Sequence, residues 1–230
     1  MMSGEAQIIL VGGSKGGPGK STIAQQIAGY LLNRAKKKVH LLDIDAQRTT
    51  YQWCQDRESL PAEKPAEKLS YHYRGDGVIE YLDGIKGQFD YIVIDAGGFD
   101  SEAQREAMLR ATHLLLPIRP KRRDVRSLAA LDRIVEKAQT LNEDLKVRVV
   151  MNQCPALPNQ YSRIQFAKDV CETFGMFALN TNIYARNVYD DAEEAGRTIF
   201  ELTKEERDKK AEAEIELLVK EFVYGEKVDG

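Results

Sequence analysis

Short apolar segments alternate along this 230-residue chain with segments in which apolar residues recur every three or four positions. Short apolar runs predict buried strands, and the three-to-four spacing predicts one face of a helix. This alternation is typical of a parallel sheet covered by helices on both faces. We therefore expect an α/β fold with a mainly parallel, twisted sheet in a single domain, residues 1–230. The segments that predict strands are "IILV" from Ile8, "VHLLDID" from Val39, "YIVID" from Tyr91, "HLLLPI" from His113 and "VRVVMN" from Val147.

Polar and glycine residues predict where several helices begin and end. Gly175 follows a helical segment at the position where a left-handed residue often ends a helix. Asp124 is placed to cap the helix that follows it. Thr203 and Glu206 have the spacing of a capping box before the last helix. The apolar face of that last helix consists of Ala211, Ile215, Leu218 and Phe222.

Composition and charge narrow the class of protein. With 33 Lys+Arg against 36 Asp+Glu the formal net charge is -3, so nucleic-acid binding would have to depend on a local basic patch. The three cysteines are far apart in the chain, which favours reduced thiols in a cytoplasm over a disulfide framework. We see no signal peptide, and no apolar run approaches the ~20 residues that span a bilayer. We therefore expect a cytoplasmic protein.

The first predicted strand runs into a glycine-rich loop, "VGGSKGGPGKST", from Val11 to Thr22. Such a loop between a strand and a helix directs backbone N–H groups and a helix dipole toward an anion. Lys20 can reach the β- and γ-phosphates of a nucleotide, and the Ser21 hydroxyl is a ligand for Mg²⁺. The strict P-loop pattern fails at its first position, Ser14, so a glycine-rich turn without a ligand is the alternative. The glycines that let the backbone follow a phosphate chain are Gly16, Gly17 and Gly19.

The loop "SKGGPGKST" resembles the deviant Walker A motif, x-K-G-G-x-G-K-[ST], of the ParA/MinD family of ATPases. The resemblance implies a P-loop NTPase fold, ATP as the nucleotide and a homodimer that forms with ATP. Short plasmid-partition ParA proteins are the most similar group. Further segments resemble family motifs in the same order: "VHLLDIDAQ", "FDYIVIDAGG", "THLLLPIRPKRRDVRSL", "VVMNQ" and "IYARNVYDDAEEAGRTIFEL". The residues implied at the nucleotide are Gly16, Gly17, Pro18, Gly19, Lys20, Ser21 and Thr22.

The same resemblance assigns a separate role to Lys15. In this family the first lysine of the loop crosses the dimer interface and contacts the phosphates of the partner's nucleotide. A cation that reaches phosphate in this way stabilises transition-state charge and couples dimerisation to the nucleotide. Lys15 is therefore expected to be catalytic, together with Lys20 and Asp45. The alternative is a solvated loop lysine.

Three aspartates end predicted strands. Asp43 and Asp45 are two residues apart, so their carboxylates point to the same side of a strand. At the carboxyl edge of a parallel sheet they would face the phosphate crevice. The resemblance implies that Asp45 positions the hydrolytic water, that Asp43 supports the metal shell and that Asp95 holds Mg²⁺ through water. With Ser21 these acids form the expected metal set, and the alternative for each is a cap on a loop or helix.

The sequence departs from the family pattern at two places that concern hydrolysis, and one asparagine concerns the choice of nucleotide base. Ala46 stands where the family usually has proline, and Ala96-Gly97-Gly98 replaces a turn of the Thr-Pro-Pro type. Both leave the geometry of the switch loops and the hydrolysis rate open. Asn152 resembles the adenine-facing asparagine of the family. The segment "NQCP" is not the N-K-x-D of a guanine site, so ATP is favoured over GTP.

A basic cluster is the densest positive feature of the chain. Cations at the start of a helix are unfavourable unless phosphate offsets them, from a nucleotide or from DNA; a solvated surface is the alternative. The resemblance implies non-specific DNA binding by the ATP-bound dimer. The cluster is Lys121, Arg122, Arg123 and Arg126, and further candidates are Arg186, Arg197, Lys204 and Lys210.

Two related activities are less favoured. The last helix carries glutamates on its polar sides, and anionic lipid repels such a helix, so we expect no membrane attachment. Only "MMSGEAQ" precedes the first strand, so we expect no N-terminal helix-turn-helix.

The sequence thus predicts an Mg²⁺-dependent ATPase that segregates plasmid or chromosomal DNA. The resemblance implies a nucleoid-associated protein that works with a small centromere-binding adaptor, such as a ribbon-helix-helix protein. Two alternatives stay open: a ParA-like regulator of positioning or conjugation, and a metabolic P-loop ligase.

Overall fold

The computed structural model describes residues 4–13, 17–61, 66–98, 101–125 and 128–228. Within these residues one sheet of seven strands has the order β3-β2-β4-β1-β5-β6-β7, and all neighbouring strands are parallel. The predicted α/β class is therefore confirmed. The strands are β1 (Gln7–Val11), β2 (Val39–Asp43), β3 (Ser70–Tyr73), β4 (Tyr91–Asp95), β5 (His113–Ile118), β6 (Lys146–Cys154) and β7 (Ala178–Tyr184).

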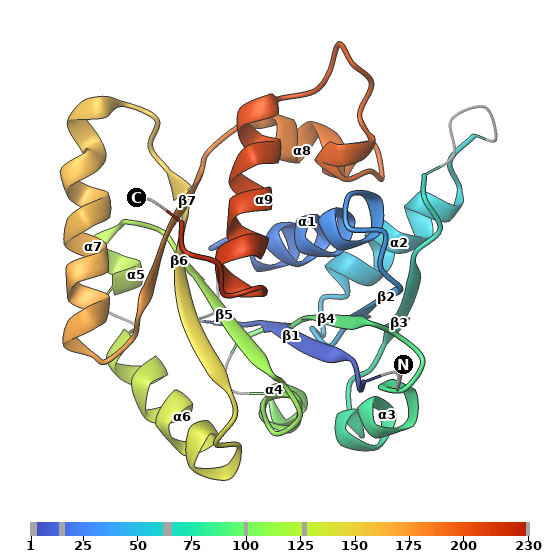
Figure 1. The fold of residues 1–230 in the computed structure, drawn as a ribbon, viewed down its shortest axis with the longest axis horizontal. Helices are drawn as coiled ribbons and strands as arrows, with labels where there is room; N and C mark the ends of the chain where they lie inside the picture. The colour runs from blue at the N-terminus through green and yellow to red at the C-terminus, as the bar shows by residue number, and fades with distance from the viewer. Residues whose placement is uncertain (1–3, 14–16, 62–65, 99–100, 126–127, 229–230) are drawn as a thin grey trace.

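Helices cover both faces of the sheet (Figure 1). Helices α1, α2, α8 and α9 pack on one face, and α3, α4, α6 and α7 pack on the other. Across the described residues, no helix is both long and apolar enough to cross a membrane. The helices are α1 (Lys20–Asn33), α2 (Thr49–Glu58), α3 (Val78–Ile85), α4 (Glu102–Met108), α5 (Arg122–Val125), α6 (Leu128–Leu141), α7 (Tyr161–Thr173), α8 (Asn187–Glu194) and α9 (Lys209–Phe222), with 3₁₀ turns η1 (Pro158–Gln160) and η2 (Ile199–Glu201).

The central strand β1 shows why continuous apolar runs form this sheet. Ile9 and Val11 belong to the core beneath α1, whereas Ile8 and Leu10 belong to the core on the opposite face. Side chains of a strand alternate between faces, so a strand covered on both sides needs apolar residues throughout. The register places Val11 opposite Asp95 of β4, so β4 ends beside the loop that follows β1.

Two of the predicted helix ends differ in outcome. Gly175 follows the end of α7 with a left-handed φ of 67°, as predicted. Asp124 lies inside α5, and its carboxylate accepts hydrogen bonds from Arg119 at 2.5 and 3.1 Å. Residues 126–127, which precede α6, lie outside the described residues, so the capping role of Asp124 stays a prediction.

The predicted capping box before the last helix forms its hydrogen bonds but does not begin the helix. Both the backbone N–H and the hydroxyl of Thr203 donate to Glu206, at 3.1 and 2.9 Å. Helix α9 begins only at Lys209, with Asp208 as its N-cap. A complete capping box occurs earlier, at Thr198 and Glu201, where η2 begins.

Candidate nucleotide-binding site

The loop after β1 directs the N-terminus of α1 toward the carboxyl edge of the sheet. Gly19 is the N-cap of α1 with a left-handed φ of 78°, and no side chain caps this end. A Cβ atom on Gly19 would lie 2.5 Å from Nδ2 of Asn152, so glycine permits this close approach. The first turn of α1 has no acidic residue, so its N–H groups and dipole favour an anion. The predicted Lys15 and Gly16 lie outside the described residues.

Lys20 opens helix α1 and lies among the acids of the site. Burial lowers the pKa of its ammonium, whereas the negative charges of Asp95 and Asp45 raise it. A partly buried cation beside a helix N-terminus is suited to phosphate oxygens. The structure thus brings Lys20 together with two of the three predicted aspartates.

Asp43 is the last residue of β2 and pairs in register with Asp95 of β4. Its two carboxylate oxygens accept hydrogen bonds from the backbone N–H groups of Asp45 and Tyr51, each at 2.8 Å. Burial raises the pKa of Asp43, and these hydrogen bonds partly oppose the rise. The carboxylate therefore shapes the turn between β2 and α2, which is the capping alternative. Its part in a metal shell stays a prediction.

Asp95 ends β4 and is almost completely buried. Its Oδ2 accepts a hydrogen bond of 2.6 Å from the Thr50 hydroxyl, whereas its Oδ1 is a buried oxygen without a hydrogen-bond partner in the described structure. Burial, followed by the negative charge of Asp43, raises the pKa of Asp95 to about 7. An unsatisfied carboxylate oxygen beside Lys20 fits a cation or a cation-bound water.

Asp45 lies in the turn after β2, close to the loop after β4. Its Oδ1 accepts a hydrogen bond of 3.1 Å from the backbone N–H of Gln47. A Cβ atom on Gly97 would lie 3.0 Å from the carboxyl carbon of Asp45, so the glycine at this position leaves room for the carboxylate. Glycine at position 97, a departure from the family pattern, therefore lets the loop after β4 approach the turn after β2 closely.

The predicted magnesium ligands fit only as part of a larger set. Among the described residues, no three His, Cys, Asp or Glu side chains converge into a metal site of their own. Mg²⁺, however, usually keeps several waters and binds one or two protein oxygens together with substrate phosphates. Ser21, in the first turn of α1, and the unsatisfied oxygen of Asp95 could hold Mg²⁺ in this way. With both carboxylate oxygens of Asp43 already engaged, that residue is a weaker ligand.

A cavity of about 420 Å³ adjoins the phosphate loop on the side of β6 and β7. Gly19 and Thr22 line one wall, and Asn152 and Asp190 line others. Asn152 is buried, and its Nδ2 donates a hydrogen bond of 2.7 Å to the backbone oxygen of Pro18. This asparagine thus links β6 to the phosphate loop. The cavity lies where a base and ribose could extend from the phosphates, and the adenine contact of Asn152 stays a prediction.

Two residues of the site were not expected from the sequence. The Thr50 hydroxyl accepts a hydrogen bond of 3.2 Å from Gln25 of α1 and donates to Asp95, so it joins two halves of the site. Arg119 lies beside the phosphate loop, because a Cβ atom on Gly17 would lie 3.3 Å from its Nη1. Arg119 precedes the basic cluster in the chain and could have been included with it, whereas nothing in the sequence pattern marks Thr50.

The described residues of the predicted basic cluster are exposed, whereas Arg186 and Arg197 are half-buried and both have polar partners. Arg186 donates to Glu214 at 2.5 Å and to Asp208 at 3.4 Å, so it fixes the start of α8 to α9. Arg126 lies outside the described residues. The exposed basic candidates are Lys121, Arg122, Arg123, Lys204 and Lys210.

A protein-family comparison matches this arrangement. The family model of ATPase MipZ matches residues 7–143, more than half of the chain. This range includes the phosphate loop and the three aspartates Asp43, Asp45 and Asp95. The chain belongs to the MipZ family of ATPases. The match also confirms the resemblance to the ParA/MinD ATPases and the P-loop NTPase fold.

Individual relatives agree with this family. The chain is 28% identical over 203 residues to maintenance of carboxysome distribution protein A of Halothiobacillus neapolitanus, covering 88% of this chain and 90% of the relative. The fold of this chain is similar to that of a McdA variant from Cyanothece in complex with ATP, with a TM-score of 0.72 at 18% identity. The match covers 98% of this chain and 99% of that chain. A plasmid partition protein from Borrelia burgdorferi has a TM-score of 0.63 at 17% identity, covering 95% of this chain and 100% of that protein.

Proposed function

We propose that this MipZ-family ATPase is an ATP-dependent dimerising switch that positions a cellular cargo on DNA. In this proposal the phosphate loop and the N-terminus of α1 hold the phosphates, and the cavity beside β6 holds the base and ribose. ATP joins two protomers, and slow hydrolysis returns them to monomers. Lys20, Asp45 and Asp95 lie close together at the N-terminus of α1, and this observation carries the proposal.

Each residue has a defined task in this proposal. Lys20 binds the β- and γ-phosphates. Asp45, which is partly exposed beside Gly97, orients the hydrolytic water. Mg²⁺, when bound near Ser21 and Asp95, supplies positive charge that offsets the phosphate oxygens. Lys15 reaches the partner's nucleotide across the dimer interface, which makes dimerisation depend on ATP.

The cargo has two candidates. The relative that spans 88% of the chain is named for carboxysome distribution, which supports positioning of a large protein body. A plasmid partition protein shares the fold, which is consistent with DNA segregation. We expect a small adaptor protein on either cargo to stimulate hydrolysis, of the ribbon-helix-helix type where the cargo is a plasmid. Membership of this ATPase family favours both over a metabolic ligase.

DNA retention by the dimer tests the proposal. A chain of net charge -3 should bind duplex DNA weakly as a monomer, because its basic patches compete with repulsion from the remaining surface. Dimerisation doubles each patch, and the effective-concentration gain can reach ~10²–10⁴-fold. We expect retention on duplex DNA of any sequence with ATP and Mg²⁺, and release with ADP. Sedimentation in the same buffers reports the dimer. Absence of ATP-dependent dimers, or of DNA retention at about 50 mM salt where phosphate contacts are strong, would refute the proposal.

A further inference from the structure

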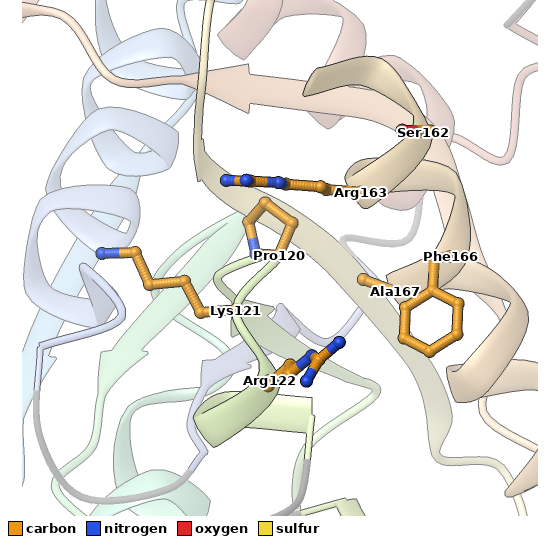
Figure 2. A pocket seen from close by; sticks show the side chains of 7 residues that line it. All are labelled: Pro120, Lys121, Arg122, Ser162, Arg163, Phe166 and Ala167. Atoms are coloured by element: carbon orange, nitrogen blue, oxygen red, sulfur yellow. The ribbon is translucent and has the colours of Figure 1, made fainter. Parts of the chain in front are cut away.

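A second hollow lies next to the nucleotide site, between the turn after β5 and helix α7 (Figure 2). Its volume is about 570 Å³. Pro120 and Arg122 come from the turn and α5, while Arg163, Phe166 and Ala167 come from the first turns of α7. Helix α5 packs against α7, so residues some forty positions apart in the chain form one surface. None of the tasks assigned to the nucleotide site uses this hollow.

Three exposed cations surround the hollow: Lys121, Arg122 and Arg163. Within the described part of the chain none of them forms an ion pair, and Arg163 contacts only the amide of Gln160, at 3.3 Å. No carboxylate lines the hollow. On a chain of net charge -3, three unneutralised cations at one place favour an anionic ligand.

The floor of the hollow is apolar and aromatic. Ala167 is buried beneath it, and the side chain of Phe166 is 59% exposed. An exposed phenylalanine ring gains by being covered, and its face can stack on a flat group. In Figure 2 the ring of Phe166 lies on one side of the hollow with Arg122 toward it, while the charged ends of Lys121 and Arg163 lie on the opposite side.

We propose that this hollow binds a single strand of nucleic acid, with phosphates on the three cations and one base stacked on Phe166. A single strand carries one negative charge and one flat ring per nucleotide, which fits a hollow that has three cations and one exposed ring on its walls. The bases of a duplex are stacked inside it and cannot cover Phe166. An acidic peptide would satisfy the cations but would leave the ring without a flat partner. DNA and RNA share the required chemistry.

The hollow is also connected to the nucleotide site. Lys121 lines both this hollow and the cavity that adjoins Asn152. A strand that engages the Lys121 ammonium therefore changes the wall of the nucleotide cavity. We expect a bound strand to change the affinity for ATP, and ATP to change the affinity for the strand by the same factor.

Fluorescence anisotropy tests the proposal with labelled oligo(dT) and oligo(rU) of about 15 nucleotides, and with a duplex of equal length. The full-length protein is used without nucleotide, at about 50 mM salt. We expect both single strands to bind more tightly than the duplex. Phe166→Ala should weaken single-strand binding by roughly 5- to 150-fold, the loss of one stacked base. Arg163→Gln should lower the salt slope by about 0.7, the value for one phosphate contact of a single strand.

The matched control is Phe177→Ala, which removes another exposed ring, 65% exposed and close to Arg148, away from the hollow. It should leave binding unchanged. Phe166 is largely exposed, so its replacement leaves the fold intact, and circular dichroism checks this. Duplex binding as tight as single-strand binding, equal effects of the two alanine variants, or displacement by polyglutamate but not by unlabelled oligo(dT) would each overturn the proposal. Because nucleotide-free protein is used, failure here is separate from failure of ATP-dependent dimerisation.

Discussion

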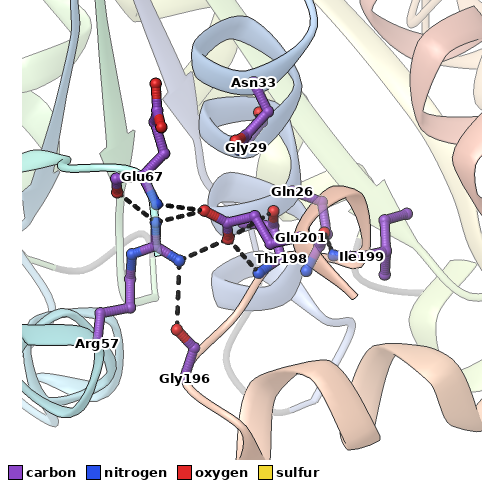
Figure 3. A network of polar contacts seen from close by, with 9 residues as sticks. All are labelled: Gln26, Gly29, Asn33, Arg57, Glu67, Gly196, Thr198, Ile199 and Glu201. Carbon is purple, nitrogen blue, oxygen red and sulfur yellow. Dashed lines mark hydrogen bonds and ion pairs between the residues drawn. The ribbon is translucent and has the colours of Figure 1, made fainter. Parts of the chain in front are cut away.

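Arg57 of α2 and Glu201 of η2 form a buried ion pair that can be tested quantitatively (Figure 3). The side chains are 4% and 7% exposed, and two parallel hydrogen bonds of 2.6 and 2.8 Å join them. Arg57 also donates to the backbone oxygens of Gly196 and Glu67, at 3.2 and 2.7 Å. Arg57→Met keeps an apolar stem of similar length but removes every one of these donors.

The expected loss follows from the burial of the partner. Without Arg57 the carboxylate of Glu201 stays buried, and among the described residues it keeps hydrogen bonds only from Thr198 and from the backbone of Glu67. Breaking a buried pair by removing one partner costs about 3–5 kcal/mol. Removing both charges leaves no uncompensated charge. We therefore expect the double variant, Arg57→Met with Glu201→Leu, to be less destabilised than the sum of the two single variants by about 2 kcal/mol or more.

Urea unfolding followed by circular dichroism at neutral pH measures these free energies. Lys220→Met is the matched control, because its i,i+4 pair with Glu216 is exposed to solvent and should contribute little to stability. Burial alone would raise the pKa of Glu201, but the hydrogen bonds and charge of Arg57 outweigh it and lower that pKa. The contribution of the pair is therefore complete above the ordinary value of 4.5 and is lost as the pH falls through the folded-state pKa. An Arg57→Met loss under about 1 kcal/mol, or additive single losses, would refute this reasoning.

Three further predictions concern the nucleotide site. Asp45→Ala should bind ATP and remain dimeric with hydrolysis reduced at least ~10²-fold, because the attacking water loses its orienting group; phosphate-release assays and sedimentation measure both, and wild-type turnover would contradict the assignment. Lys15→Ala should bind ATP by fluorescence titration yet sediment as a monomer, and a normal ATP-dependent dimer would exclude the trans role. The raised pKa of Asp95, about 7, means that the folded state without Mg²⁺ retains a proton that the unfolded state releases near 3.8. Stability should therefore fall as the pH rises toward 7, by an amount on the order of 4 kcal/mol; Asp95→Asn should remove this slope from urea titrations in chelator, and an unchanged slope would exclude Asp95 as its source.

The sequence predicts strands well where both faces are covered and poorly at the edges of the sheet. The apolar runs at β1, β2, β4, β5 and β6 predict the strands that lie inside the sheet. The two strands that escaped prediction, β3 and β7, are the edge strands. Half of the residues of β3, "SYHY", are exposed, and β7 alternates buried and more exposed positions. Four or seven residues of mixed polarity resemble a loop as much as a strand, because only the neighbouring strand gives them their pairing.

The site divides along similar lines. Lys20, Asp43 and Asp95 each follow or end a predicted strand. The sequence therefore places all three at the same sheet edge, because parallel strands end together there. Hydrogen bonds between distant segments cannot be predicted from motif spacing. The bond from Thr50 to Asp95 joins residues 45 positions apart, and the bond from Asn152 to Pro18 joins residues 134 positions apart. Only the packing of α2 on the sheet, and of β6 beside the phosphate loop, brings these pairs within bonding distance.

Helix α2 is held at both ends by polar contacts between side chains that are far apart in the chain. Its first turn is held by the bond from Thr50 to Asp95, and its last turn is held by the ion pair of Arg57 with η2. Turn η2 is in turn bound to α1, because Gln26 accepts a hydrogen bond of 3.0 Å from its first backbone N–H. Helices α1 and α2 and turn η2 are therefore each linked to the other two by polar contacts. The turn between β2 and α2, which carries Asp45, precedes these fixed points, and Arg48 within it has a left-handed φ of 56°.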